Sequence, residues 1–211
     1  ISGDDGADEL FGHGGDDVIF FDASDTIVLG GSGIDTAVYT GTQGITFDLQ
    51  AHEFEIAYGG EGNDVFHAAY DGYSVSIYGG SGNDQINASA TDDLLSGDDG
   101  NDLINGNAGD DWIVGGSGRD SLRGDEGDDL ILGGNDADQL NGGHGDDYLY
   151  GGDADDIIVG HLGDDFLSGD AGADQLSGGN GDDQLHGGVG IDTLAGNAGD
   201  DRLFGGEGKD Y

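Results

Sequence analysis

The feature that most constrains this chain is a nine-residue repeat that keeps its register from Gly79 to Tyr211. The units follow the pattern Gly-Gly-x-Gly-x-Asp-x-apolar-x, and residues 97–105 (GDDGNDLIN) are a representative copy. Self-similarity at a fixed short period is typical of solenoids, in which every unit repeats one small structural element. The periodicity therefore predicts a stacked, elongated fold.

Within a unit, the first six positions are typical of a turn and the last three of a short strand, because glycine tolerates positive φ and close backbone approach. Position eight is predicted to point inward. One inward residue per unit cannot form a core, so the units must stack, with two units in each coil. The predicted inward residues are Leu95, Ile104, Ile113, Leu122, Ile131, Leu140, Leu149, Ile158, Leu167, Leu176, Leu185, Leu194 and Leu203.

Position six is Asp in every unit from Asp84 onward. With two units per coil, Asp102 is expected to stack near Asp120 at the strand spacing of about 4.8 Å. Such carboxylates repel one another, and calcium, which takes six to eight oxygens, would remove the conflict. The predicted metal ligands are Asp8, Asp17, Asp35, Asp64, Asp84, Asp93, Asp102, Asp111, Asp120, Asp129, Asp138, Asp147, Asp156, Asp165, Asp174, Asp183, Asp192, Asp201 and Asp210.

The repeat resembles the calcium-binding nonapeptide of the RTX (repeats-in-toxin) family, also called hemolysin-type repeats. The resemblance covers nearly the whole chain. It implies an all-β fold, a right-handed parallel β-roll (a β-solenoid) of stacked nonapeptide half-coils with calcium in the turns. It also implies an extracellular or cell-surface protein that is exported by type I secretion and folds when it meets calcium outside the cell.

Charge favours the same interpretation, because 46 acidic residues face only 4 basic ones, for a formal net charge of −42. Self-repulsion of this size destabilises a compact state, and an acidic, Gly-rich chain without metal could remain disordered. Calcium on the order of ten or more ions would offset much of this charge. Folding and metal binding are then expected to be one reaction.

The regularity divides the chain into three parts of one continuous elongated domain. Residues 1–38 contain degenerate repeats, and one unit has Thr26 at the Asp position, where we expect little metal binding. Residues 39–78 are irregular apart from one good unit at 59–67, and residues 79–211 form the uninterrupted array. Alternating apolar residues predict strands in 39–78. They favour metal-free rungs of the same roll, with a separate subdomain or a loop as the alternative.

Other chemistries are not supported by the residues. The chain has no Cys and its six His are scattered, without a metal-binding or catalytic spacing. Acidic turns argue against nucleic acid and anionic membranes as partners, and no apolar run reaches the roughly 20 residues of a membrane helix. We therefore expect a segment that is not an enzyme and does not insert into membranes.

Two classes of function remain from the sequence. The first is a calcium-triggered structural module of a secreted or surface protein. The alternative is a calcium-dependent assembly or adhesion unit that self-associates end to end in a filament, surface layer or biofilm matrix. Tyr211 stops at position seven and Ile1 fits position eight, which motivates the alternative, although a cut within a longer array explains it equally. A weaker third interpretation is a substrate-binding accessory to an extracellular enzyme.

Overall fold

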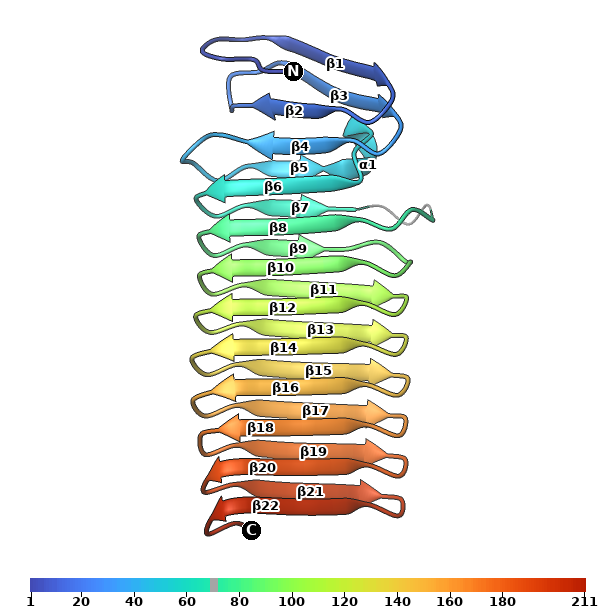
Figure 1. Cartoon of the computed structure of the whole chain (residues 1–211), viewed down its shortest axis with the longest axis vertical. Coiled ribbons are helices and arrows are strands. Elements are labelled where there is room, and N and C mark those ends of the chain that lie inside the picture. The colour runs from blue at the N-terminus through green and yellow to red at the C-terminus, as the bar shows by residue number, and fades with distance from the viewer. Residues whose placement is uncertain (69–71) are drawn as a thin grey trace.

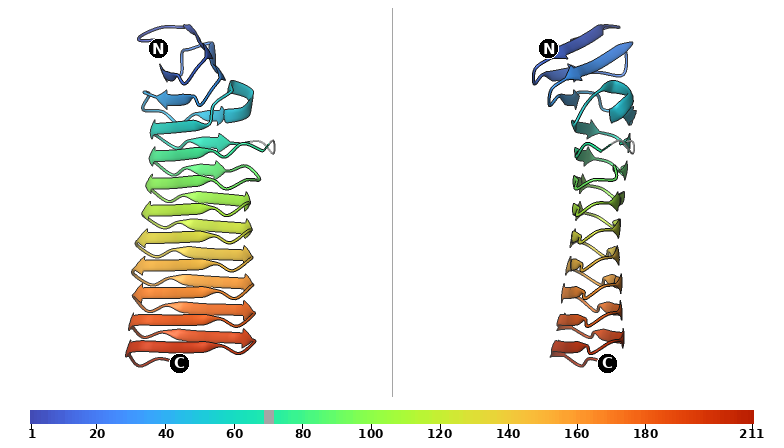
Figure 2. Two further views of the ribbon diagram at one scale, coloured as in Figure 1. Left: turned by 45° about the vertical axis from the view of Figure 1, so that its right-hand side comes forward. Right: turned by 90° about the vertical axis from the view of Figure 1, so that its right-hand side faces the viewer.

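The computed structural model describes residues 1–68 and 72–211 and shows two parallel β-sheets that face one another along a flat, elongated roll. Figure 2 shows the sheets edge on, with successive strands alternating between them. The eleven-stranded sheet contains β2 (Val18–Phe21), β4 (Thr36–Tyr39), β6 (Ile56–Glu61), β8 (Ser76–Ser81), β10 (Leu94–Asp99), β12 (Trp112–Ser117), β14 (Leu130–Asn135), β16 (Tyr148–Asp153), β18 (Phe166–Ala171), β20 (Gln184–Gly190) and β22 (Arg202–Gly208).

The nine-stranded sheet lies opposite and contains β5 (Thr46–Asp48), β7 (Val65–His67), β9 (Gln85–Asn87), β11 (Leu103–Ala108), β13 (Ser121–Glu126), β15 (Gln139–His144), β17 (Ile157–Leu162), β19 (Gln175–Asn180) and β21 (Thr193–Ala198). A separate two-stranded sheet at the N-terminal end pairs β1 (Glu9–Gly14) with β3 (Ile27–Ser32). All named pairs are parallel, so the predicted all-β parallel roll is confirmed.

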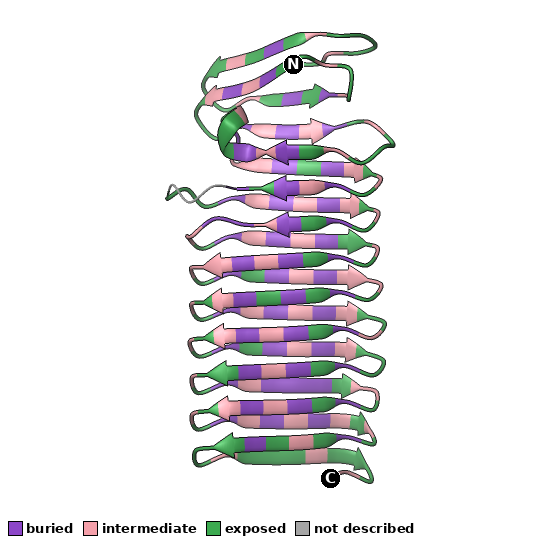
Figure 3. Cartoon of the chain, turned by 180° about the vertical axis from the view of Figure 1, so that it is seen from behind, coloured by how far each residue is buried: buried purple, intermediate pink, exposed green. Residues whose placement is uncertain are grey.

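From β8 to β20, the core is a single file of apolar side chains between the sheets, with one buried apolar residue from each strand. Ile104 pairs with Leu122 in one sheet and Ile113 pairs with Ile131 in the other. All four are almost completely buried, as the pattern of position eight predicts. The buried bands continue through the array in Figure 3.

Two of the predicted inward residues depart from this pattern near the C-terminal end. Leu194 is only partly buried, and Leu203 is 46% exposed although it pairs in register with the fully buried Leu185. Leu203 lies on β22, the last strand of its sheet, so its side chain has a neighbouring coil on one side only. The repeat pattern assigns an inward position to residue eight of every unit, whereas the burial of that residue also depends on the neighbouring coils that cover it.

The irregular segment 39–78 continues both sheets, as the interpretation of metal-free rungs predicts. β4, β6 and β8 follow one another in the eleven-stranded sheet, and β5 and β7 follow one another in the nine-stranded sheet. Bulkier buried residues, Phe47, Phe54 and Phe66, fill the interior here. Residues 69–71, part of the predicted rung at 68–78, lie outside the described residues.

A short helix, α1 (Leu49–His52), interrupts this segment and was not predicted from the alternating pattern. Asp48 caps its N-terminus by accepting a hydrogen bond from the backbone N–H of Ala51. Glu53 ends the helix in the left-handed conformation, with φ 61°. The local capping residues thus insert one helical turn where the alternation of apolar residues indicated only strands.

Candidate metal centre

The aspartates at position six form two continuous ladders, one along each edge of the roll. We call these residues the Asp ladder. The backbone N–H of Asp102 donates to Oδ1 of Asp120 at 2.8 Å, and that of Asp111 donates to Oδ1 of Asp129 at 2.8 Å. Each bond joins residues 18 positions apart, so it links one coil to the next. The predicted stacking of Asp102 on Asp120 is confirmed.

The second carboxylate oxygen of the ladder residues is left without a partner. In the described part of the chain, Oδ2 is buried and accepts no hydrogen bond in fourteen aspartates: Asp35, Asp64, Asp84, Asp102, Asp111, Asp120, Asp129, Asp138, Asp147, Asp156, Asp165, Asp174, Asp183 and Asp192. A buried charge without a partner is strongly unfavourable. A ladder of such oxygens therefore requires either protons or cations.

Burial changes the acidity of these carboxyl groups. It raises the pKa of Asp111 and Asp147 from 3.8 to about 8, and the pKa of Asp102 and Asp138 to about 7. The backbone N–H donated to each Oδ1 acts in the opposite direction, and neighbouring ladder aspartates raise the pKa further. The main cause is loss of water around the carboxylate, which disfavours its charged form.

Glycine at position one makes room for the ladder carboxylate of its own unit. A Cβ added at Gly106 would lie 2.2 Å from Oδ2 of Asp111, and one added at Gly124 would lie 1.8 Å from Oδ2 of Asp129. Both distances are far below any real van der Waals contact. The space around each free Oδ2 is therefore maintained by the absence of a side chain.

Replacing Gly124 by Ala is expected to raise the calcium concentration at the folding midpoint several-fold and to cost about 1–3 kcal/mol, as overpacking usually does. The added methyl group collides with Oδ2 of Asp129 and with the carbonyl oxygen of Gly142. Circular dichroism during a calcium titration measures the midpoint. Ser121→Ala, on the exposed start of β13, is the control and should leave it unchanged. An unchanged midpoint for Gly124→Ala would contradict the crowded turn.

Glycines at position four bring backbone oxygens into the same turns. The carbonyl oxygen of Gly82 lies 1.5 Å from the place of a Cβ on Gly100, and that of Gly100 lies 2.0 Å from the place of one on Gly118. Gly100 and Gly118 adopt φ of 140° and 115°, where side chains are rarely tolerated. No protein hydrogen bond reaches the carbonyl oxygens of Gly82 and Gly100 in the described part of the chain. The turns thus carry unused carbonyls as well as unused carboxylate oxygens.

This donor set consists only of oxygen and suits calcium. Among the described residues, no three His, Cys, Asp or Glu side chains are placed to share one metal ion. An ion in the turns would therefore take Oδ2 atoms from the Asp ladder and complete its shell with turn carbonyls. Calcium accepts such irregular, carbonyl-rich coordination, whereas magnesium demands a near-ideal octahedron.

One ladder residue, Asp93, has its free oxygen satisfied by the protein. Its unit has Ala88 at position one, where every other unit from Gly79 onward has Gly, and Ser89 at position two. The hydroxyl and the backbone N–H of Ser89 donate to Oδ2 of Asp93 at 2.8 and 2.9 Å. Ser89 thus supplies two hydrogen-bond donors to an oxygen that has none in the other turns. Whether Asp93 binds metal stays a prediction, with less support than for its neighbours.

Two acidic residues outside the repeat pattern were missed from the sequence. Asp25 accepts the N–H of Asp8 at 3.1 Å through Oδ1, one residue before the expected position occupied by Thr26. Glu55 accepts the N–H of Asp35 at 2.8 Å through Oε2. Both continue the inter-coil bonding where the nonapeptide breaks down. Strand register could have found Glu55, because Thr36 pairs with Ile56 and so places Asp35 opposite Glu55. It could not have found Asp25, because Thr26 is the residue in register with Asp8.

The remaining predicted ligands lie toward the two ends of the roll and are less enclosed. Asp8, Asp17, Asp201 and Asp210 are only partly buried. Their Oδ2 atoms are not among the buried, unpartnered oxygens of the described chain. Their role as ligands remains a prediction.

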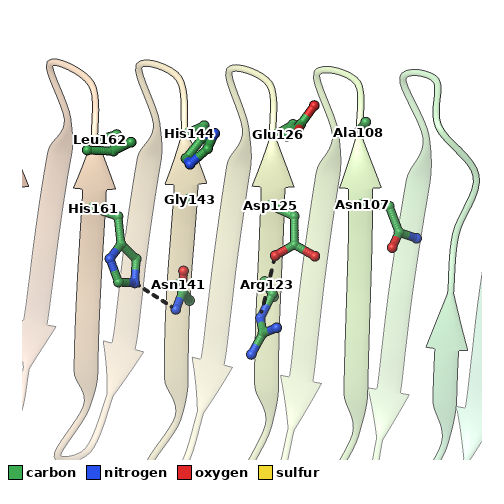
Figure 4. A pocket seen from close by; sticks show the side chains of 10 residues that line it. All are labelled: Asn107, Ala108, Arg123, Asp125, Glu126, Asn141, Gly143, His144, His161 and Leu162. Carbon is green, nitrogen blue, oxygen red and sulfur yellow. Dashed lines mark hydrogen bonds and ion pairs between the residues drawn. The ribbon is translucent and has the colours of Figure 1, made fainter.

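A hollow of about 840 Å³ lies over the nine-stranded sheet and has a different character (Figure 4). In it, His161 contacts Asn141, with 3.0 Å between His161 Nε2 and Asn141 Nδ2, and Arg123 lies 3.7 Å from Asp125. His144 projects separately from its own strand. These side chains do not converge on one point, so within the described residues the oxygen-lined turns are the better candidate for a metal.

Comparison with known proteins agrees with this geometry. The family model of the RTX calcium-binding nonapeptide repeat matches residues 1–28, 55–69 and a series of overlapping segments that together cover 78–211. A search of curated proteins found no match. Within the described residues, the structure contains no helix with the length and hydropathy needed to cross a membrane. With matches over most of its length, the chain belongs to the RTX calcium-binding nonapeptide repeat family.

Proposed function

We propose that this chain is a calcium-triggered structural module of a secreted or cell-surface protein, and that it folds outside the cell when calcium enters its turns. The observation that carries the proposal is the set of fourteen buried ladder aspartates whose Oδ2 has no partner in the described structure. Extracellular calcium-binding modules typically work at about 10⁻⁴–10⁻³ M. A site of this affinity stays empty at the far lower calcium levels of a cytosol and fills outside.

The structural role follows from the distribution of the candidate sites. They recur at every coil instead of forming one reaction centre, and each ion would join two successive turns. Calcium then contributes to folding directly, because binding sites that exist only in the folded chain make binding energy folding energy. We therefore propose that this segment is a structural element whose folding depends on calcium, and we assign no catalytic role to it.

A calcium titration followed by far-UV circular dichroism tests the proposal. We expect a cooperative change from coil to β-structure between about 10⁻⁴ and 10⁻³ M calcium. Magnesium at equal concentration is the control and should produce little structure, since it keeps its bound waters. A chain that is already rich in β-structure in the presence of a chelator would overturn the proposal.

Light scattering recorded during the same titration distinguishes the single structural module from the alternative function, which is end-to-end assembly. Leu203 and Phe204 on β22 are 46% and 48% exposed, and an edge strand offers unpaired backbone groups to a second chain. Scattering that rises with calcium and with protein concentration would favour assembly into filaments. Scattering that stays at the level of a monomer would favour the single module.

A further inference from the structure

The two outer faces of the roll differ sharply in chemistry. On five successive strands of the eleven-stranded sheet, β10 to β18, the first and third residues are mostly apolar or aromatic: Leu94, Ser96, Trp112, Val114, Leu130, Leu132, Tyr148, Tyr150, Phe166 and Ser168. We call this surface the apolar face. Trp112 and Tyr148 on it are 50% and 54% exposed. No acidic side chain occupies these positions in a chain with 46 acidic residues.

The same positions on the nine-stranded sheet are mostly polar. They are Leu103, Asn105, Ser121, Arg123, Gln139, Asn141, Ile157, Val159, Gln175 and Ser177 on β11 to β19. Outer side chains of neighbouring strands pack on one another, as Tyr148 does on Phe166, but both sheets share the same inward core, so the core does not account for the difference between the two outer faces. Trp112 and Tyr148 are exposed and the other apolar residues of the face are half-buried. A contiguous apolar surface that remains accessible to water on an otherwise polar protein typically marks an interaction surface.

A row of aspartates borders the apolar face. Position five is Asp in seven successive turns that precede strands of the eleven-stranded sheet: Asp92, Asp110, Asp128, Asp146, Asp164, Asp182 and Asp200. We call them the outer Asp row, and all seven are exposed. The corresponding residues on the opposite edge are mixed: Asn101, Arg119, Ala137, Asp155, Ala173, Ile191 and Lys209. At position five, an unbroken row of aspartates is therefore present on one edge alone, although the opposite edge carries exposed acidic residues at other turn positions, such as Asp98, Asp99 and Asp153.

The outer Asp row is held in place by the backbone. The N–H of Asp128 donates to Oδ1 of Asp110 at 2.9 Å, and the N–H of Asp146 donates to Oδ1 of Asp128 at 2.8 Å. Equivalent bonds of 2.8–3.0 Å connect the whole row from Asp92 to Asp200. A partner would thus meet carboxylates that are already oriented, which lowers the entropic cost of binding.

A hollow of about 420 Å³ joins the row to the apolar face. Its walls include Leu94, Trp112 and Leu130 on one side and Asp110 and Asp128 on the other. This combination suits an Arg or Lys side chain, whose cationic group can lie over the Trp112 ring or pair with carboxylates while its methylene stem contacts apolar surface. Neighbouring Leu and Val side chains would accept the apolar residues of the same partner.

We propose that the apolar face and the outer Asp row together dock a cationic amphipathic peptide segment of a partner protein. A second copy of this chain does not provide the matching charge, because it has only 4 basic residues against 46 acidic ones. The partner is therefore a different molecule, with apolar residues that cover the face and Lys or Arg residues that reach the row. Asp93 and Asp111 of the Asp ladder also line the hollow, but the proposed contacts use the exposed carboxylates of the outer Asp row and not the buried Oδ2 atoms of the ladder.

The test uses the whole chain in saturating calcium and a synthetic amphipathic helix made of Leu and Lys. Trp112 is the only Trp in the sequence, so its fluorescence reports binding at the hollow. We expect a blue shift and saturable binding in calorimetry. The triple variant Asp110→Asn, Asp128→Asn, Asp146→Asn keeps the Oδ1 acceptors of the row and should weaken binding at least tenfold. Leu130→Ser should weaken it several-fold.

Matched variants on the other surfaces serve as controls. Asp155→Asn on the opposite edge and Ile157→Ser on the polar face should leave the affinity within twofold. A peptide with the same composition, scrambled so that it is not amphipathic, should bind at least tenfold more weakly. Equal binding of the scrambled peptide, equal binding to the triple variant, or sedimentation showing that the face is covered by a second copy would each overturn the proposal.

Discussion

Without calcium, the chain is expected to be unfolded at pH 8.5 and to gain β-structure as the pH is lowered to about 5. The buried ladder carboxyls explain the direction. Their pKa values in the folded chain are raised from 3.8 to about 7 for Asp102 and about 8 for Asp111. Between these limits the folded state binds more protons than the unfolded state, so its stability falls as the pH rises through this interval.

The expected effect is large because many ladder residues share it. Each unit of pKa corresponds to about 1.4 kcal/mol, while a whole domain is typically stable by only about 5–15 kcal/mol. Several buried, unprotonated aspartates are therefore enough to unfold the metal-free chain. Protons and calcium are expected to be alternative ways of stabilising the same oxygens. At about pH 5, where the metal-free chain is folded with protonated carboxyls, calcium binding should release protons.

Far-UV circular dichroism in chelator, recorded from pH 8.5 to pH 4.5, measures this transition. Dilute protein and parallel light scattering are needed because the sequence pI is about 4.1 and neutralised chains associate. The calcium-saturated chain is the control and should keep its β-signal at neutral and alkaline pH. A metal-free chain that is fully β-structured at pH 8.5, or unstructured at pH 5, would contradict the role of the buried carboxyls.

Substitutions of Asp138 are expected to distinguish the roles of its two carboxylate oxygens. Oδ1 accepts the backbone N–H of Asp120 at 2.8 Å, whereas the buried Oδ2 has no partner within the described structure. Asp138→Asn preserves the first contact and removes the charge. Above pH 7 we therefore expect Asn to stabilise the metal-free fold and to shift its pH midpoint upward. The calcium midpoint should nevertheless rise about 3–10-fold, because an amide nitrogen is not a calcium ligand.

Asp138→Ala is expected to make both the metal-free fold and the calcium-bound fold less stable than they are in the Asn variant. It removes the acceptor and leaves the N–H of Asp120 buried without a partner, a loss of about 1–3 kcal/mol. The metal-free pH midpoint should then lie below that of the Asn variant, which keeps the acceptor, while the calcium midpoint again rises and the transition becomes less cooperative. Exposed Asp155→Asn is the matched control and should change neither midpoint. Calcium midpoints unchanged in both Asp138 variants would rule out Asp138 as a ligand.

The stacking of units was predictable because it depends on local chemistry repeated at a fixed interval. The expected pairing of Asp102 with Asp120 and the inward position of Ile104 are both present. Prediction weakened wherever the interval changed. Glu55 takes the place of a ladder aspartate because the wider turn that contains α1 places it 20 residues after Asp35. Asp25 lies one residue before Thr26, which is in register with Asp8, and only the folded turn shows that its side chain reaches the N–H of Asp8.

The candidate site was predicted as a set of residues but not as a set of atoms. Sequence spacing indicates that carboxylates recur along an edge, and it treats Asp93 and Asp111 alike. Only the packed turn shows that Asp93 receives two hydrogen bonds from Ser89 while Oδ2 of Asp111 receives none in the described structure. Hydrogen-bond satisfaction is a property of the enclosed turn, because it depends on which donors come within about 3 Å.

The nine-residue sequence pattern by itself determined the solenoid, the one inward apolar residue per strand and the two edges of aspartates, because from Gly79 onward every unit carries Asp at position six and all but one carry Gly at position one. The tertiary structure decided which variable positions lie side by side, because successive strands alternate between the two sheets. It gathers Leu94, Trp112 and Leu130 on one outer face, and it aligns Asp110 and Asp128 beside them. Residues 18 apart become neighbours only when the coils stack, so the contrast between the two faces arises from the fold.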